Sequence, residues 1–263
     1  MGKIIAVANQ KGGVGKTTTA VNLSACLAAR QQRILLIDLD PQANATSGCG
    51  AGAESLNGSS YEVLLGLADI VSVTHSVEIP NLHLVPSHMR LAGAEVEMAA
   101  LIGRDRRLAE AVEPVRTSFD YILIDCPPSL GLLTINALTA ADSVLIPLQC
   151  EYYALEGLSK LLDSVKRVQR YLNPRLRVEG ILLTMYDGRL QLARRVAEEA
   201  RAFFGDKVYS TCIRRNVSLA EAPSHGQPII LYDPVSAGAA NYTALAQEVC
   251  SVPAPAAALA RAC

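Results

Sequence analysis

Short apolar runs alternate along the chain with stretches in which apolar positions recur at helical spacing. Six of the apolar runs predict strands at 3–8, 33–38, 82–85, 121–125, 143–147 and 178–184. Between them we expect helices at about 17–30, 88–115, 131–141, 154–172 and 189–204. Several strands are apolar on both faces, as strands inside a parallel sheet are. The alternation predicts an α/β fold with a doubly wound, mostly parallel sheet flanked by helices.

The chain is expected to form one domain over residues 1–250. Its 263 residues are enough to bury one substantial core, and no internal repeat or long linker interrupts the pattern. The last segment, 251–263, contains Pro253, Pro255 and several alanines. We expect this segment to be a flexible tail.

Composition excludes some classes of protein. The 24 basic and 25 acidic residues give a formal net charge of −1, which argues against a constitutively basic nucleic-acid binder and against a disordered polyanion. No apolar run approaches the roughly 18 residues that span a bilayer, and the N-terminus lacks a signal-peptide core. The seven cysteines form no C-x-x-C pair. We expect reduced thiols and a cytoplasmic location.

A glycine-rich turn joins the first predicted strand to the first predicted helix. It reads Lys11-Gly12-Gly13-Val14-Gly15-Lys16-Thr17-Thr18. Such a turn points successive backbone N–H groups at phosphate oxygens, and the helix N-terminus adds partial positive charge. Lys16 is placed to neutralise the β- and γ-phosphates, and the Thr17 hydroxyl to bind Mg²⁺. The turn predicts a site for ATP or ADP with Mg²⁺, although Gln10 replaces the first glycine of the general pattern and Lys11 is an additional lysine.

Acidic residues also stand at the ends of two predicted strands. Asp40 follows the second strand in the sequence Asp38-Leu39-Asp40-Pro41-Gln42, and Asp125 ends a later strand. At the carboxyl edge of a parallel sheet, such a carboxylate can hold Mg²⁺ or orient an attacking water. Each could equally be an ordinary strand-terminal aspartate that caps a loop. Because both strands can lie near the phosphate loop, we favour a role at the nucleotide.

Together these motifs resemble the ParA/MinD class of P-loop ATPases, which carry a deviant Walker A motif, and most closely its ParA/Soj chromosome-partitioning branch. The resemblance runs from Lys3 to about Tyr242. Besides the motifs above it rests on blocks at 44–46, 125–130, 151–158 and 215–226. The last two blocks point to the Soj-like branch.

The resemblance implies roles that the residues alone do not. Lys11 would cross the interface of an ATP-bound homodimer and contact the partner's phosphates, and Gly12 would remain small at that interface. Asp40 would position the hydrolytic water, and Asp125 would be the Walker B acid. Arg215 would lie at the nucleotide. The neighbouring Arg214 stands where relatives usually have proline. This departure leaves open how the chain contacts the adenine base.

The resemblance also implies partners. The ATP-bound dimer would bind double-stranded DNA without sequence preference through arginines of the C-terminal half, and a ParB-type centromere-binding protein would stimulate hydrolysis and release. We expect a nucleoid-associated protein. The candidate DNA contacts are Arg189, Arg194, Arg214 and Arg215. On the residues alone, these arginines could simply be solvated. In the helix expected at 189–204, Leu192, Val196 and Phe203 would form the apolar stripe opposite Arg194 and Arg201.

Three other functions remain open on the same fold. A MinD-like membrane regulator would need a C-terminal amphipathic basic helix, and the residues from 252 onward are a poor match. An iron–sulfur ATPase would need paired cysteines, and Cys126 beside Asp125 is the single suggestive position. An ATPase that positions a protein cargo is scarcely excluded.

Overall fold

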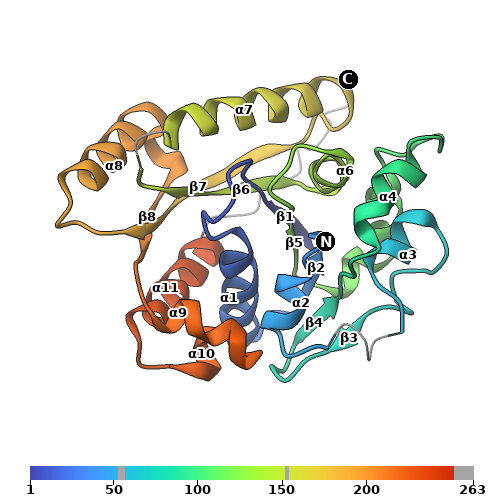
Figure 1. Cartoon of the computed structure of the whole chain (residues 1–263), viewed down its shortest axis with the longest axis horizontal. Coiled ribbons are helices and arrows are strands. Elements are labelled where there is room, and N and C mark those ends of the chain that lie inside the picture. The colour runs from blue at the N-terminus through green and yellow to red at the C-terminus, as the bar shows by residue number, and fades with distance from the viewer. Residues whose placement is uncertain (53–56, 152–153, 252–263) are drawn as a thin grey trace, which may run out of the picture.

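The fold is built on one sheet with the strand order β3-β4-β2-β5-β1-β6-β7-β8. The computed structural model describes residues 1–52, 57–151 and 154–251, except the side chains of 154–156. All neighbouring strands are parallel apart from the β3–β4 pair. The strands are β1 (Lys3–Val7), β2 (Ile34–Asp38), β3 (His75–Ser76), β4 (Leu82–Val85), β5 (Tyr121–Asp125), β6 (Ser143–Gln149), β7 (Arg177–Tyr186) and β8 (Val208–Arg214). The predicted doubly wound, mostly parallel α/β sheet is confirmed (Figure 1).

Helices cover both faces of the sheet (Figure 1). The α-helices are α1 (Lys16–Ala29), α2 (Asn44–Gly48), α3 (Ser60–Leu65), α4 (Leu91–Met98), α5 (Arg107–Val112), α6 (Leu132–Ala140), α7 (Ala154–Tyr171), α8 (Gln191–Phe204), α9 (Ser218–Glu221), α10 (Ile229–Tyr232) and α11 (Ala237–Ser251). Short 3₁₀ turns form η2 (Glu113–Ser118), η3 (Gly205–Lys207) and η4 (Ala222–His225).

Two hydrophobic cores lie on opposite sides of the sheet. Ile5 and Val7 of β1 belong to the core under α1 and α11. The alternating residues Ile4 and Ala6 belong to the core that α4 to α8 cover. Successive side chains of a strand point to opposite faces. Burial of both faces therefore explains why the central strands are apolar at nearly every position.

The strand register brings the predicted chemistry to one edge. Strand β5 lies between β1 and β2, and Asp125 is the register partner of both Val7 and Asp38. The glycine-rich turn follows β1, and the Asp40 loop follows β2. The turn, this loop and Asp125 therefore meet at the carboxyl edge of the sheet, where ligands of doubly wound folds bind.

The predicted elements are largely confirmed, with one helix wrong. All six strands and four of the five helices lie within two residues of their predicted bounds. The single helix expected at 88–115 is instead α4, α5 and η2, separated by a turn in which Gly103 has a φ of 71°. Pro114 lies near the start of η2. Because proline has no N–H, it ends the α-helical hydrogen-bond pattern there. Neither β8 nor α11 was predicted.

The predicted tail cannot be compared with the structure over most of its length. Ser251 is the last residue of α11, and 252–263 lie outside the described residues, as do Tyr152 and Tyr153 of the family block at 151–158. The assignment of residues 1–250 to one domain stays a prediction.

Candidate nucleotide-binding site

The turn between β1 and α1 has the backbone form of a phosphate-binding loop. Gly13 and Gly15 have φ values of 73° and 86°, a region in which a Cβ atom is crowded. The Thr184 hydroxyl donates to the Val14 carbonyl at 2.8 Å, which attaches the turn to β7. Helix α1 begins directly afterwards, at Lys16. Its first N–H groups lack partners within the helix and can bind phosphate oxygens.

Lys16 is the buried cation of this turn. It is 5% exposed, and its Nζ donates to the Lys11 carbonyl at 3.1 Å. Burial lowers the pKa of Lys16, while the nearby carboxylate of Asp125 raises it. A buried ammonium group is stabilised when an anion binds beside it. The position suits the role predicted from the sequence, contact with the β- and γ-phosphates.

Asp38 organises the loop that carries Asp40. Its buried carboxylate accepts hydrogen bonds from the Thr46 N–H and hydroxyl, both at 2.8 Å, and from the Asp40 N–H at 3.0 Å. Asp40 is 7% exposed, and its carboxylate accepts a bond from the Gln42 N–H at 2.9 Å. From the sequence we assigned the positioning of water or Mg²⁺ to Asp40, and the loop-holding role of Asp38 was missed. An acidic residue at the end of an otherwise apolar strand is the sequence feature that could have indicated it.

Asp125 is a buried carboxylate at the end of β5. The Thr17 hydroxyl is near enough to lower its pKa, but neither oxygen makes a well-formed hydrogen bond within the part of the chain that the structure describes. Burial raises the pKa of Asp125 well above its usual range, and its neighbour Asp38 raises it further. A cation bound beside these two carboxylates would offset both effects.

Mg²⁺ fits this environment. Thr17 is the second residue of α1, after Lys16, and the Asp125 carboxylate supplies the hard oxygen ligand that Mg²⁺ prefers. Among the described residues, no group of three His, Cys, Asp or Glu side chains could hold a metal ion. Mg²⁺ would therefore take phosphate oxygens as further ligands, as it does in P-loop ATPases. Thr17 and Asp125 would hold it, with Asp40 nearby, and it would neutralise charge that develops on the phosphates.

Lys11 and Gly12 lie at the exposed rim of the turn. The Lys11 Nζ is 2.6 Å from Glu151 Oε2, and the two side chains are 41% and 48% exposed. A Cβ atom added to Gly12 would have no neighbour within 4 Å. Among the residues that the structure describes, none therefore requires glycine at position 12. The partner of Lys11 was missed, because the two residues lie in distant parts of the sequence.

A cavity of about 270 Å³ adjoins the phosphate-binding turn. It extends from the turn to the end of β8, and its lining includes Thr18, Thr184, Met185, Arg215, Leu219 and Tyr242. Its mixture of apolar and polar side chains suits a nucleotide base. Arg214 also lines it, and the Arg214 N–H donates to Asn241 Oδ1 at 3.1 Å. Proline has no N–H, so this bond depends on the departure from the family's usual residue.

Three of the four candidate DNA-binding arginines gather at a second cavity, of about 470 Å³. Arg189, Arg214 and Arg215 line it together with Tyr186 and Asp187. Asp187 binds Arg189 through both carboxylate oxygens, at 2.9 and 2.7 Å. These bonds to Arg189 lower the pKa of Asp187 to about 2. The sequence analysis did not anticipate this carboxylate within the basic cluster.

Arg194 is exposed on α8, and it does not line this cavity. The apolar stripe predicted for this helix is wrong in part. Val196 is buried, but Leu192 and Phe203 are 45% and 82% exposed. Alanines form most of the buried face, which consists of Ala193, Val196, Ala197 and Ala200. The small residues of α8 therefore face the core, and Leu192 and Phe203 lie at the surface.

Comparison with known proteins identifies the family. The AAA domain family model matches residues 2–178. The chain is 58% identical over 249 residues to the sporulation initiation inhibitor protein Soj of Bacillus subtilis (strain 168), which covers 95% of this chain and 98% of that protein. It is 53% identical over 249 residues to the chromosome partitioning protein ParA of Myxococcus xanthus (strain DK1622), with 95% and 88% covered. The chain belongs to the ParA/Soj family of ATPases.

Solved structures agree with this assignment. The chain is 37% identical to a cobyrinic acid a,c-diamide synthase from Mycobacterium smegmatis that was solved with ADP and magnesium, and the two superpose with a TM-score of 0.82. The alignment covers 94% of this chain and 93% of that one. This ParA/Soj ATPase therefore has a P-loop fold that binds ATP or ADP with Mg²⁺ and hydrolyses ATP. Of the helices that the structure describes, none is long and apolar enough to span a membrane.

Proposed function

We propose that this ATPase partitions a chromosome or plasmid by binding DNA in its ATP state. ATP and Mg²⁺ would join two copies into a sandwich dimer, and the dimer would bind double-stranded DNA of any sequence. A ParB-type centromere-binding protein would stimulate hydrolysis and thereby release the ATPase from DNA. The relatives named Soj and ParA support the partitioning role.

The placement of Arg214 and Arg215 carries the proposal. Both residues line the cavity suited to the base and also the arginine-lined cavity beside it. A change at the nucleotide can therefore reach the basic surface through two adjacent residues. Arginines at a surface attract the phosphate backbone without reading sequence. A two-fold dimer would present the arginine cluster twice. The local positive field would then be stronger than the net charge of −1 per chain suggests.

Within the dimer, each residue of the turn has a proposed task. Lys11 would exchange Glu151 for the phosphates of the partner copy, and Gly12 would allow the two turns to approach. Lys16 and the N–H groups from Gly13 to Thr18 would hold the phosphates. Asp40 would position the attacking water, since its backbone N–H is held by the Asp38–Thr46 hydrogen-bond network and its carboxylate accepts the N–H of Gln42.

Fluorescence anisotropy of a random-sequence duplex tests the proposal. The duplex is titrated with the protein in the presence of ATP, ADP or no nucleotide, across a series of salt concentrations. We expect binding with ATP alone and an affinity that falls steeply with salt, because bound phosphates release counterions. Equal binding in all three nucleotide states would contradict ATP gating. Absence of binding, with ATP hydrolysis intact, would favour a membrane or protein cargo on the same fold.

A further inference from the structure

The segment that leads into α4 is bonded to the Asp40 loop. The Ser87 N–H donates to the Thr46 hydroxyl oxygen at 2.9 Å, and that hydroxyl donates to Asp38 at 2.8 Å. Asp38 in turn accepts the N–H of Asp40 at 3.0 Å. All of these contacts are buried. The start of this segment is therefore one support of the loop that follows β2.

Helix α4 itself contacts the loop that follows Asp125. Glu95 Oε1 accepts a hydrogen bond at 3.1 Å from the N–H of Leu133, the second residue of α6. A carboxylate at a helix N-terminus satisfies one of the unpaired N–H groups and interacts favourably with the helix dipole. The residue before α6, Gly131, has no capping side chain of its own. Glu95 thus caps α6 from a different helix.

Gly131 and Glu95 fit each other sterically. A Cβ atom at position 131 would lie 2.2 Å from Glu95 Oε1, too close for both to remain in place. The φ of Gly131 is −76°, which any residue adopts without strain. Any other residue at this position would therefore displace the Glu95 carboxylate, which is the end of a flexible side chain, and the backbone conformation imposes no requirement for glycine.

These contacts hold the Asp125 loop at both ends. At its start, the Cys126 N–H donates to the Val7 carbonyl at 3.2 Å. At its end, Glu95 holds the first turn of α6. Between these points, the Thr134 hydroxyl donates to the Ser129 carbonyl at 2.6 Å, which attaches the middle of the loop to α6. The Gly131 carbonyl also accepts the Ile135 N–H at 3.0 Å, so loss of the Glu95 contact would remove one of the bonds that hold this end of the loop.

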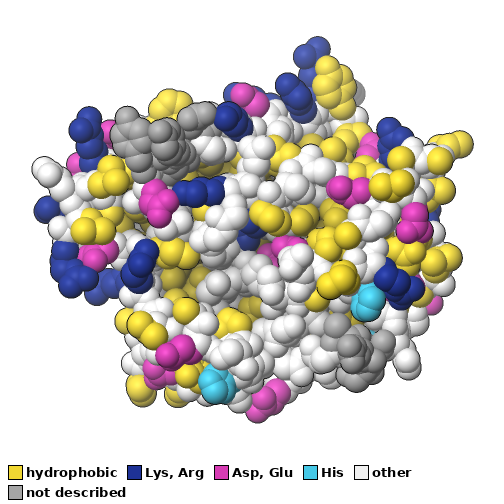
Figure 2. Space-filling view, in the orientation of Figure 1, with side chains coloured by type: hydrophobic (Ala, Val, Ile, Leu, Met, Phe, Trp, Pro, Cys, Tyr) yellow, Lys and Arg dark blue, Asp and Glu magenta, His cyan; other side chains and the backbone are white. Residues whose placement is uncertain are grey.

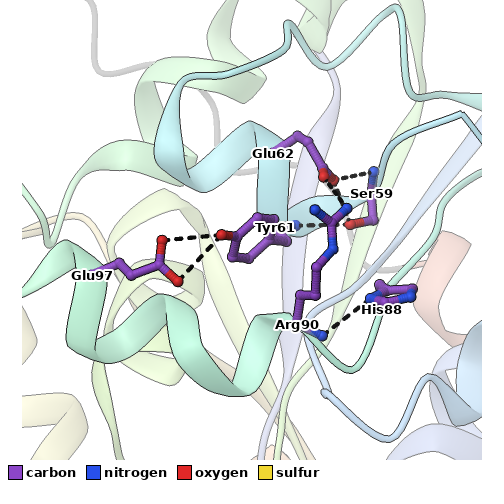
Figure 3. Close-up of polar contacts among 6 residues, drawn as sticks. All are labelled: Ser59, Tyr61, Glu62, His88, Arg90 and Glu97. Carbon is purple, nitrogen blue, oxygen red and sulfur yellow. Dashed lines mark hydrogen bonds and ion pairs between the residues drawn. The ribbon is translucent and has the colours of Figure 1, made fainter.

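Helix α4 is firmly attached to α3 on its outer side (Figure 3). The Tyr61 hydroxyl donates to the Glu97 carboxylate, at 3.0 and 3.2 Å to its two oxygens. Arg90 pairs with Glu62, and its guanidinium lies 4.8 Å from the centre of the Tyr61 ring. Glu62 also accepts the N–H of Ser59 in a capping box at the start of α3. These contacts lie at the surface, whereas the buried side chains of Leu91, Ala94 and Met98 hold α4 in the core and make it a support for Glu95.

We propose that Glu95 is a positioning residue for ATP hydrolysis. It would act through the loop of residues 126–131, by keeping that loop in the conformation in which the Asp125 carboxylate meets Mg²⁺ and the phosphates. Glu95 itself does not lie among the residues of the nucleotide site. The proposal rests on the role proposed for Asp125, and it does not depend on DNA binding.

Three variants on α4 test it by steady-state ATP hydrolysis. Glu95→Ala should lower kcat by up to about tenfold and leave the KM for ATP within about twofold, because the stabilisation that a cap supplies would be missing from the transition state, and its usual size corresponds to at most about this factor. Glu95→Gln should keep most of the activity, because its amide oxygen can accept the same N–H. Glu97→Ala is the matched control on the same helix. It removes a carboxylate bound to Tyr61 and should leave kcat near that of the unchanged protein.

Gly131→Ala provides the second test. The added methyl group should displace the Glu95 carboxylate and lower kcat about as much as Glu95→Ala does. In a chain that already carries Glu95→Ala, the methyl group meets no carboxylate, so Gly131→Ala should have little further effect. This non-additivity separates the specific contact from general destabilisation. ADP affinity should be unchanged in every variant, which shows that the site is folded.

Two results would overturn the proposal. One is an unchanged kcat in Glu95→Ala. The other is a loss of kcat on Gly131→Ala that is equal with and without Glu95. Asp125→Asn, measured in parallel, isolates the role of Asp125. If Asp125→Asn retains turnover, the role of Asp125 fails; if it is inactive while Glu95→Ala is unaffected, only the role of Glu95 fails.

Discussion

Lys11 and Glu151 form an ion pair across the mouth of the phosphate-binding turn, with Nζ 2.6 Å from Oε2. Both side chains are about half exposed, so water and salt screen their attraction. Exposed pairs of this kind contribute about 1 kcal/mol or less. In the single chain, the lysine is therefore held away from a partner copy by a contact that is easily exchanged.

Glu151→Gln should favour the ATP-bound dimer. The amide holds Lys11 less strongly, so more of the free chain presents the lysine to a second copy. We expect the dimer dissociation constant to fall by about twofold to fivefold, in line with an exposed pair. Analytical ultracentrifugation with ATP, in an Asp40→Ala background to prevent hydrolysis, measures it. A weaker dimer would instead mean that Glu151 contributes contacts across the interface.

Gly12→Val should permit ATP binding and block dimerisation. A Cβ atom at position 12 meets none of the described residues within 4 Å, so the added bulk is expected to act on a second copy. A sizing column run with ATP should show only single chains, while the affinity for ADP is retained. A dimer of normal abundance would refute the close approach at Gly12.

Lys16→Ala should abolish productive nucleotide binding. This buried ammonium lies beside the turn, and its removal leaves the phosphates without their nearest cation. Calorimetric titration should show ADP affinity reduced by at least about a hundredfold, the scale of a lost charged hydrogen bond in a buried site. Lys207→Ala, which changes an exposed lysine of η3, is the control. Equal ADP affinity in the two variants would contradict the role of Lys16.

The stability of the ligand-free protein should fall as pH rises. Burial raises the pKa of Asp38 to about 6 and also raises that of Asp125, whereas both return to about 4 in the unfolded chain. Through Asp38 the folded protein thus binds more protons than the unfolded chain between about pH 4 and pH 6, and through Asp125 it continues to do so at higher pH. Its free energy of unfolding falls through this window, by about 1–3 kcal/mol.

Denaturant unfolding at pH 5 and pH 7.5 measures this dependence. Mg²⁺ binds ionised carboxylates, so stabilisation by Mg·ADP should be larger at pH 7.5. Asp125→Asn replaces the titrating group by one of similar shape, and it should reduce the difference between the two pH values. A ligand-free protein that is equally stable at both pH values, or more stable at pH 7.5, would contradict the expectation.

Arg214→Glu should weaken binding to every DNA sequence to a similar degree. The residue lines the arginine-lined cavity, and the loss of one phosphate contact should reduce the slope of log affinity against log salt by about 1. Arg30→Glu, at the end of α1 remote from the phosphate-binding turn, is the charge-matched control. ATP affinity is measured as well, because Arg214 also lines the cavity beside the turn. A loss confined to one DNA sequence would contradict non-specific binding.

The strands, four helices and the phosphate-binding turn could be predicted because their signals are local. A strand buried on both faces is an apolar run, and the left-handed positions in the turn require Gly13 and Gly15. The helix expected at 88–115 failed because apolar spacing alone did not reveal the turn at Gly103. Strand β8 lies at the sheet edge and is partly exposed, so it lacks the continuous apolar run by which the central strands were recognised.

The sequence could name the candidate residues of the site, because glycines, lysines, a threonine and aspartates in this order have few other uses. Their relations needed the tertiary structure. The register places Asp38 beside Asp125, the Lys11–Glu151 pair joins distant segments, and the Glu95 carboxylate occupies the space left by Gly131. Periodicity indicates only the local secondary structure of a segment and which of its faces is buried. These contacts arise when the burial of both sheet faces brings remote segments together, so the fold alone decided them.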